Sequence, residues 1–184
     1  MAETVDHFAT LGLERSAALD EAFVRERFHE MSREAHPDAE DGDESRFAAI
    51  NEAQRVLSSP AARLRHLLEL EYGGKVESTG AMSAQLMDLF SDVGSALSQA
   101  DALISKRQAA TTAVSKALLA GEEVSVQQAL MGAGGQLMGR RQEIEAGLGG
   151  ISLSDRGKLV ATAHELAFLE KWQRQVQERL GQLI

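Results

Sequence analysis

The sequence predicts an all-α protein, and the amino-acid composition is the basis of this prediction. The 184 residues include only two prolines, Pro37 and Pro60, and both fall in the first third of the chain. Proline interrupts helices, so long stretches without it favour helical structure. Only 4% of the residues are aromatic, and runs rich in Val, Ile, Thr and Tyr are few. Little strand-forming material is left, and we expect helices joined by turns.

The first two predicted helices lead to a proline turn. A short helix spans about residues 5–12. Asp20 has the side chain of an N-cap and begins a second helix, over residues 20–35. This helix stops at His36-Pro37-Asp38, because a residue before proline avoids the α region.

The second predicted helix carries a basic row that is separate from its core face. At 100° per residue, four apolar residues share one stripe and predict the buried side: Val24, Phe28, Met31 and Ala35. Arg25, His29 and Arg33 lie on another face, which we expect to be exposed. A row of glutamates lies between, so weak i,i+4 ion pairs are the alternative to a role in binding.

Two further helices and a change of composition complete the first portion. A third helix spans about residues 44–57, and Ser59 with Pro60 begins a fourth that ends at Gly73. Residues 1–72 hold 8 basic and 16 acidic residues, whereas residues 73–184 hold 11 and 12. We therefore predict a first domain of residues 1–72, a linker at 73–82 and a second domain at 83–184.

The second portion predicts three helices packed as a bundle. Its first helix begins near Ser83 and has the 4-3-4-3-4 apolar spacing of a bundle seam: Leu86, Phe90, Val93, Leu97, Ala100 and Ile104. The pattern fades towards Gly121, and a second helix is expected over about residues 125–148. Four glycines interrupt this helix, which we expect to be the weakest. The last helix spans about residues 154–183.

The composition excludes or disfavours several classes of function. The absence of cysteine excludes disulfides, thiolate metal sites and a cysteine nucleophile. A net charge of −9 disfavours nucleic acid as a partner, and no apolar run approaches the roughly 20 residues of a membrane span. The five histidines lack metal-binding spacing, and no phosphate-binding loop is present. The first six residues lack the basic character of a signal peptide. We expect a cytoplasmic protein with no catalytic residue, metal or cofactor.

Three motifs, in this order, resemble the J domain of the DnaJ family. They are Phe8-Ala9-Thr10-Leu11-Gly12-Leu13, His36-Pro37-Asp38, and Arg46-Phe47-Ala48-Ala49-Ile50-Asn51-Glu52-Ala53. The resemblance covers about residues 6–65. It implies a co-chaperone that binds a DnaK-type ATPase chaperone and stimulates ATP hydrolysis.

Shorter matches resemble one branch of this family, the HscB-type co-chaperones of iron–sulfur cluster assembly. They are Ser59 to Leu70, Leu86-Met87-Asp88 and Phe168-Leu169-Glu170-Lys171. The resemblance implies an L-shaped arrangement of a J domain and a C-terminal three-helix bundle. The implied partners are a DnaK/HscA-type chaperone and, as client, an IscU-like scaffold protein.

The resemblance also implies which residues bind each partner. The chaperone-binding residues are His36, Pro37, Asp38, Arg25, His29 and Arg33. The client-binding residues are Leu86, Met87, Phe90 and Phe168. Leu86 and Phe90 lie on the predicted seam, so burial in the bundle is an equal alternative for them. Met87 lies off the seam and is the better candidate for an exposed contact.

Two departures from the family pattern leave alternatives open. Ala39, followed by acids, stands where the family usually has a basic residue. The acids after the Leu-Met step are reduced to Asp88 and Asp92, with Gly94 nearby. One alternative is a J-domain co-chaperone with a different client. Another is a structural helical adaptor that no longer engages a chaperone. The missing nucleophile and metal spacing oppose a hydrolase.

Overall fold

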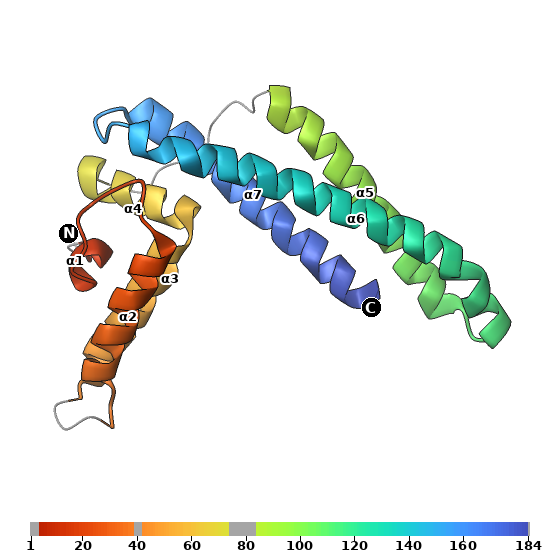
Figure 1. The fold of residues 1–184 in the computed structure, drawn as a ribbon, viewed down its shortest axis with the longest axis horizontal. Helices are drawn as coiled ribbons and strands as arrows, with labels where there is room; N and C mark the ends of the chain where they lie inside the picture. The colour runs from red at the N-terminus through yellow and green to blue at the C-terminus, as the bar shows by residue number, and fades with distance from the viewer. Residues whose placement is uncertain (1–3, 39–41, 74–83, 184) are drawn as a thin grey trace. The chain divides into compact units, whose positions relative to one another are not determined.

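The described residues are mainly helical and comprise 4–38, 42–73 and 84–183 of a computed structural model. They form seven α-helices and one 3₁₀ turn, with no strand, so the predicted all-α class is confirmed (Figure 1). Ala39 and most of the predicted linker lie outside the described residues. The chain divides into two compact units: Met1–Gly80 with Ile144–Ala167, and Ala81–Glu143 with Phe168–Ile184.

Four helices begin the first unit, and acidic or hydroxyl side chains cap them. They are α1 (His7–Thr10), α2 (Glu21–Ala35), α3 (Glu44–Ser58) and α4 (Pro60–Tyr72). Asp20 accepts a hydrogen bond from the N–H of Ala22, and Ser59 accepts one from Ala62, as an N-cap does. Both predicted helix starts are therefore confirmed, whereas α1 is shorter than predicted.

The core of the first unit draws on two distant parts of the chain. Fully buried side chains from α1, α3 and α4 form one cluster with residues that follow position 143: Phe8, Ile50, Leu57, Leu64, Leu67, Leu68, Leu148, Leu159 and Leu166. These later residues belong to a 3₁₀ turn (Leu148–Gly150) and to the start of α7 (Arg156–Leu183). The Tyr72 hydroxyl donates a hydrogen bond to the Leu153 carbonyl oxygen at 2.8 Å. The core of this unit therefore includes the segment 144–167.

The second unit is a bundle of three helices. It contains α5 (Ala84–Ala109), residues 113–143 of α6 (Ala113–Gly147) and residues 168–183 of α7. Each helix contributes buried side chains, namely Val93, Leu103, Leu130, Leu137, Leu169 and Val176. An ion pair of 3.0 Å joins Arg179 of α7 to Asp101 of α5. The three helices are thus connected by apolar packing and by charge.

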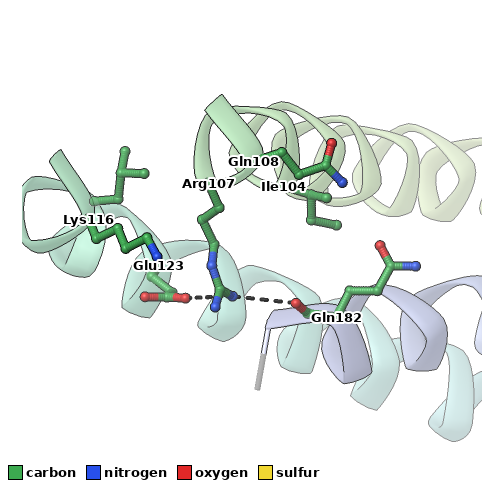
Figure 2. A pocket seen from close by; sticks show the side chains of 7 residues that line it. Ile104, Arg107, Gln108, Lys116, Glu123 and Gln182 are labelled. Atoms are coloured by element: carbon green, nitrogen blue, oxygen red, sulfur yellow. Dashed lines mark hydrogen bonds and ion pairs between the residues drawn. The ribbon is translucent and has the colours of Figure 1, made fainter. Parts of the chain in front are cut away.

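Polar contacts join the three helices again at one end of this bundle. The Arg107 guanidinium of α5 pairs with Glu123 of α6 at 2.8 Å and donates a hydrogen bond to the Gln182 carbonyl oxygen of α7 (Figure 2). These residues, with Ile104 and Lys116, line a pocket of about 680 Å³. Because the Arg107 contacts connect all three helices at this end, we assign the pocket a structural role in the bundle.

The bounds predicted for the middle bundle helix are wrong at the N-terminal end. Helix α6 begins at Ala113 and continues without a break through Gly121, where the pattern was expected to fade. Thr112 and Ser115 explain this start, because each backbone N–H donates to the hydroxyl of the other residue, at 3.1 Å in both cases. This reciprocal arrangement has the form of a capping box. None of the helices among the described residues is long and apolar enough to cross a membrane.

Candidate functional site

The predicted basic row lies on the outer face of α2. Val24 and Ala35 are buried, whereas Arg25, His29 and Arg33 are exposed, as predicted. Within the described part of the chain, the structure records no ion pair for these three side chains. The neighbouring glutamates use other partners: Glu30 pairs with Arg27 and Glu34 with Arg46 of α3. The basic row is therefore exposed and available for a partner.

The His36-Pro37-Asp38 turn directly follows α2. His36 is extended, with φ −58° and ψ 135°, as a residue before proline must be. Its Nδ1 atom accepts a hydrogen bond from the Asp38 N–H at 3.2 Å. The ring of His36 packs edge-on against Phe47 of α3, with ring centroids 5.3 Å apart. The imidazole is therefore held by the Asp38 N–H and by Phe47. The Asp38 side chain is 92% exposed, with one carboxylate oxygen 3.6 Å from His36 Nδ1.

The far side of this turn depends on two residues that the sequence analysis did not select. A Cβ atom added at Gly42 would collide with the carbonyl oxygen of His36 and lie 3.0 Å from the Pro37 carbonyl carbon. Asp43 caps α3 with its side chain, and its N–H donates to the Ala35 carbonyl oxygen at 3.2 Å. Gly42 and Asp43 thus close the loop between α2 and α3. An aspartate directly before an apolar periodic run is an N-cap signal that could have identified Asp43, whereas no sequence signal identifies Gly42.

The basic row and the turn meet at a shallow groove. Its volume is about 540 Å³, and it is lined by Phe28, His29, Ser32, Arg33, His36, Asp38 and Phe47. Its lining combines two aromatic rings, of Phe28 and Phe47, with basic and acidic side chains. The structure brings five of the six predicted chaperone-binding residues to this turn and groove. Arg25 lies two helical turns before Arg33, on the same row.

The predicted client-binding residues lie in the second unit, and the structure separates them by exposure. Met87 is 60% exposed and Phe90 54%, whereas Leu86 is only 3% exposed. The rings of Phe90 and Phe168 each contact the buried Trp172, with centroids 5.3 and 5.8 Å away. Met87, Phe90 and Phe168 therefore present apolar surface, which we call the aromatic patch. Leu86 packs inside the bundle.

The buried His66 and the half-buried His7 have structural contacts with each other. His66 of α4 accepts a hydrogen bond from the backbone N–H of His7 at 3.0 Å, and the two rings lie 4.5 Å apart. Burial lowers the pKa of both imidazoles, and the proximity of His7 lowers the pKa of His66 further. These contacts favour neutral rings that stabilise the first unit.

Arg63 of α4 is a further structural residue that the sequence analysis missed. Its side chain is buried and donates hydrogen bonds to the carbonyl oxygens of Ala17 at 3.0 Å and Leu57 at 2.8 Å. The arginine connects α4 to the end of α3 and to the segment before α2. The described residues include no group of three or more His, Asp or Glu side chains placed to hold a metal ion.

Comparisons with known proteins agree with this architecture. Residues 6–66 match the DnaJ domain family. The chain is 41% identical over 61 residues, 32% of its length, to Chaperone protein DnaJ 2 of Nocardia farcinica, but it covers only 15% of that protein. The Co-chaperone protein HscB homolog of Azoarcus is 28% identical over 97% of this chain and 95% of its own length.

Solved structures of HscB proteins have a similar fold. Chaperone HscB from Vibrio cholerae has a TM-score of 0.62 at 21% identity, over 98% of this chain and all of its own. The human co-chaperone protein HscB also has a TM-score of 0.62, at 14% identity over 97% of this chain and 86% of its own. At these identities the likeness establishes the fold.

Residues 6–66 are thus a DnaJ domain. Over its whole length the chain is similar to HscB-type co-chaperones, in which a J domain precedes a C-terminal helical bundle, and the predicted resemblance is confirmed.

Proposed function

We propose that this protein is a co-chaperone that stimulates the ATPase of a DnaK/HscA-type chaperone and delivers an IscU-like scaffold protein to it as client. The observation that carries the proposal is the continuous exposed surface formed by the basic row and the His36-Pro37-Asp38 turn, inside a DnaJ domain. The protein itself carries out no chemical step, and the catalytic residues belong to the chaperone.

The basic row supplies the first contact with the chaperone. Arg25, His29 and Arg33 project from one face of a rigid helix without ion-pair partners among the described residues. An acidic surface on the ATP-bound chaperone would attract this row and orient the encounter, an effect that acts mainly on the association rate. Arg25 extends this surface along α2 beyond the groove, so the row would favour one orientation of the chaperone.

The proline turn supplies the contact that promotes hydrolysis. Pro37 restricts the backbone, and the His36 ring is held by Phe47 and by the Asp38 N–H, so the turn is preorganised. The Asp38 carboxylate is exposed and would accept charge-assisted hydrogen bonds from an arginine of the chaperone. An asparagine at this position has similar size but only a neutral amide oxygen to offer.

The aromatic patch supplies the client contact. Phe90 and Phe168 rest on Trp172, so their rings are positioned before any partner binds. Met87 adds a flexible apolar side chain that adapts to an irregular surface. Leu86 is buried and would contribute only by packing within the bundle. An IscU-like scaffold with an exposed apolar surface fits this chemistry, and the full-length similarity to an HscB homolog supports it.

Single-turnover ATP hydrolysis by the cognate DnaK-type chaperones tests the proposal. The rate is measured with and without this protein, and IscU is added in a second series. The proposal predicts stimulation that increases more than additively with IscU. Stimulation that does not change with IscU would contradict the proposal that IscU is the client, and would favour a J-domain co-chaperone with another client. No stimulation by the folded protein with any cognate chaperone would contradict the proposal and favour a structural adaptor.

A further inference from the structure

The outer face of α6 carries exposed apolar side chains that neither partner surface uses. From Val124 to Gly139 this helix contains no charged residue. Its inner face is buried in the bundle through Val126, Leu130, Ala133 and Leu137. Three other apolar side chains recur at intervals of seven residues and are each more than half exposed: Val124, Met131 and Met138. Exposed apolar side chains in a row mark an interaction surface more often than isolated ones do.

The glycines on this face make no close packing contact inside the bundle, although Gly139 also lines a groove beside Leu89 and Asp92 of α5. A Cβ atom added at Gly132, Gly135 or Gly139 would meet no atom within 4 Å. Each interior glycine costs a helix about 0.5–1 kcal/mol relative to alanine. No packing contact in the second unit therefore requires glycine at these three positions. A second helix laid against the outside would use them, because small residues reduce the distance at which two helices pack.

The charges at the two ends of this uncharged stretch define an orientation for such a helix. Glu122 and Glu123 precede it, and Arg140 and Arg141 follow it. If a second copy of α6 lies antiparallel, the acidic pair of each copy faces the basic pair of the other, whereas a parallel copy places like charges together. These residues also have partners within their own chain, for example Arg107 at 2.8 Å from Glu123. The contact between copies would add to networks already formed.

We propose that the outer face of α6 binds the same face of a second copy of this chain, antiparallel, about a two-fold axis between Met131 and Gly132. In this register Met131 packs over Gly132 of the partner, and Val124 packs over Gly139. Large side chains therefore meet glycines on both sides of the axis. Such a self-complementary patch is the requirement of an isologous dimer.

The contact is small, so the dimer is weak. The stretch from Glu123 to Arg141 spans about 27 Å at 1.5 Å per residue. One helix face on one helix face buries less than the roughly 1,200–2,000 Å² of stable interfaces. We therefore expect dissociation constants of tens to hundreds of micromolar, that is, about −5 to −6 kcal/mol. Residues 73–184 hold 11 basic and 12 acidic residues, so this portion does not strongly repel its copy.

Sedimentation velocity over a concentration series tests the dimer with a matched control. The wild-type chain of 19.9 kDa should approach twice its mass at the highest concentrations. Met131→Lys places a charge next to the proposed axis and should weaken the dimer more than tenfold. Leu118→Lys makes the same kind of change at an exposed residue of α6 that lies off this face, and it should leave the dimer unchanged. A wild-type chain that stays monomeric to about 1 mM, or equal effects of both variants, would overturn the proposal.

Cysteine crosslinking tests the orientation, since the chain has no cysteine of its own. Met131→Cys lies next to the proposed axis and should form a disulfide with its copy under mild oxidation. Val124→Cys alone should not, because two copies of residue 124 would lie about 22 Å apart along the helices. A mixture of Val124→Cys and Gly139→Cys chains should form the mixed disulfide. Self-crosslinking of Val124→Cys as efficient as that of Met131→Cys would indicate a parallel pair and overturn the proposed orientation.

Discussion

Replacement of Arg63 by methionine should strongly destabilise the first unit. The buried guanidinium donates to the carbonyl oxygens of Ala17 and Leu57. The Leu57 carbonyl lies in the last turn of α3, where carbonyl groups lack an intrahelical N–H partner. Methionine retains the apolar stem and the approximate volume but leaves both carbonyls without their donor. The substitution therefore isolates the hydrogen bonds from the packing.

The expected loss follows from these two contacts. Hydrogen bonds that involve a charged group contribute about 1.5–3 kcal/mol each, and a buried acceptor left without a partner costs a similar amount. Two such bonds give a decrease of about 3–5 kcal/mol in the free energy of unfolding, after some relaxation. This is a large fraction of the stability of an ordinary domain.

Urea denaturation followed by far-UV circular dichroism measures the change, and hydrogen exchange of peptides from α1–α4 assigns it to the first unit. Arg65→Met is the matched control, because Arg65 is an exposed neighbour on the same helix. This control should leave the midpoint unchanged. If Arg63→Met does not fold, Arg63→Lys should show an intermediate loss, because lysine keeps the charge but lacks the planar fork. A loss below about 1 kcal/mol in Arg63→Met would refute the reasoning.

Three further predictions concern the pH response, the turn and the aromatic patch. Burial lowers the pKa of His7 and His66 below the unfolded value of 6.5, so their contribution to stability is complete above that pH and is lost on acidification. Urea midpoints should therefore fall from pH 7 to pH 5. A constant midpoint would contradict the structural role of these two neutral rings. Gly42→Ala should reduce chaperone stimulation and lower Tm, because its Cβ would collide with the His36 carbonyl oxygen. Gly94→Ala has open space around its Cβ and should raise the free energy of unfolding, measured by thermal denaturation, by about 0.5–1 kcal/mol. Phe90→Ser should reduce the extra stimulation caused by IscU at least tenfold, while stimulation without IscU and the circular dichroism spectrum stay unchanged. An unchanged IscU effect would show that Phe90 does not belong to the client surface.

Local signals predicted most of the first unit. Asp20 and Ser59 cap the helices that they were expected to cap, and Gly73 ends α4 with φ of 71°. These features depend on a few neighbouring residues, so a sequence pattern contains them. The role of Gly42 does not follow in the same way. The need for glycine there arises from the return of the chain onto the His36 carbonyl, which only the folded loop defines.

Burial in the second unit was harder to predict. Leu86 and Phe90 lie on the same apolar seam, yet Leu86 is buried and Phe90 is more than half exposed. Periodicity identifies the face of a helix but not which positions a neighbouring helix covers. Trp172 occupies the interior and leaves the Phe90 ring on the outside. The early start of α6 was missed for a different reason, because the pairing of Thr112 and Ser115 is a weak capping signal in the sequence.

The role of Asp38 gives the most direct test of the account. The measurement is the single-turnover rate of ATP hydrolysis by the cognate DnaK-type chaperone at saturating co-chaperone. Asp38→Asn is compared with Glu14→Gln, a matched loss of one exposed carboxylate elsewhere in the first unit. We predict that Asp38→Asn abolishes stimulation with an unchanged urea midpoint, while Glu14→Gln stimulates as the wild type does. Full stimulation by a folded Asp38→Asn variant would contradict the central claim.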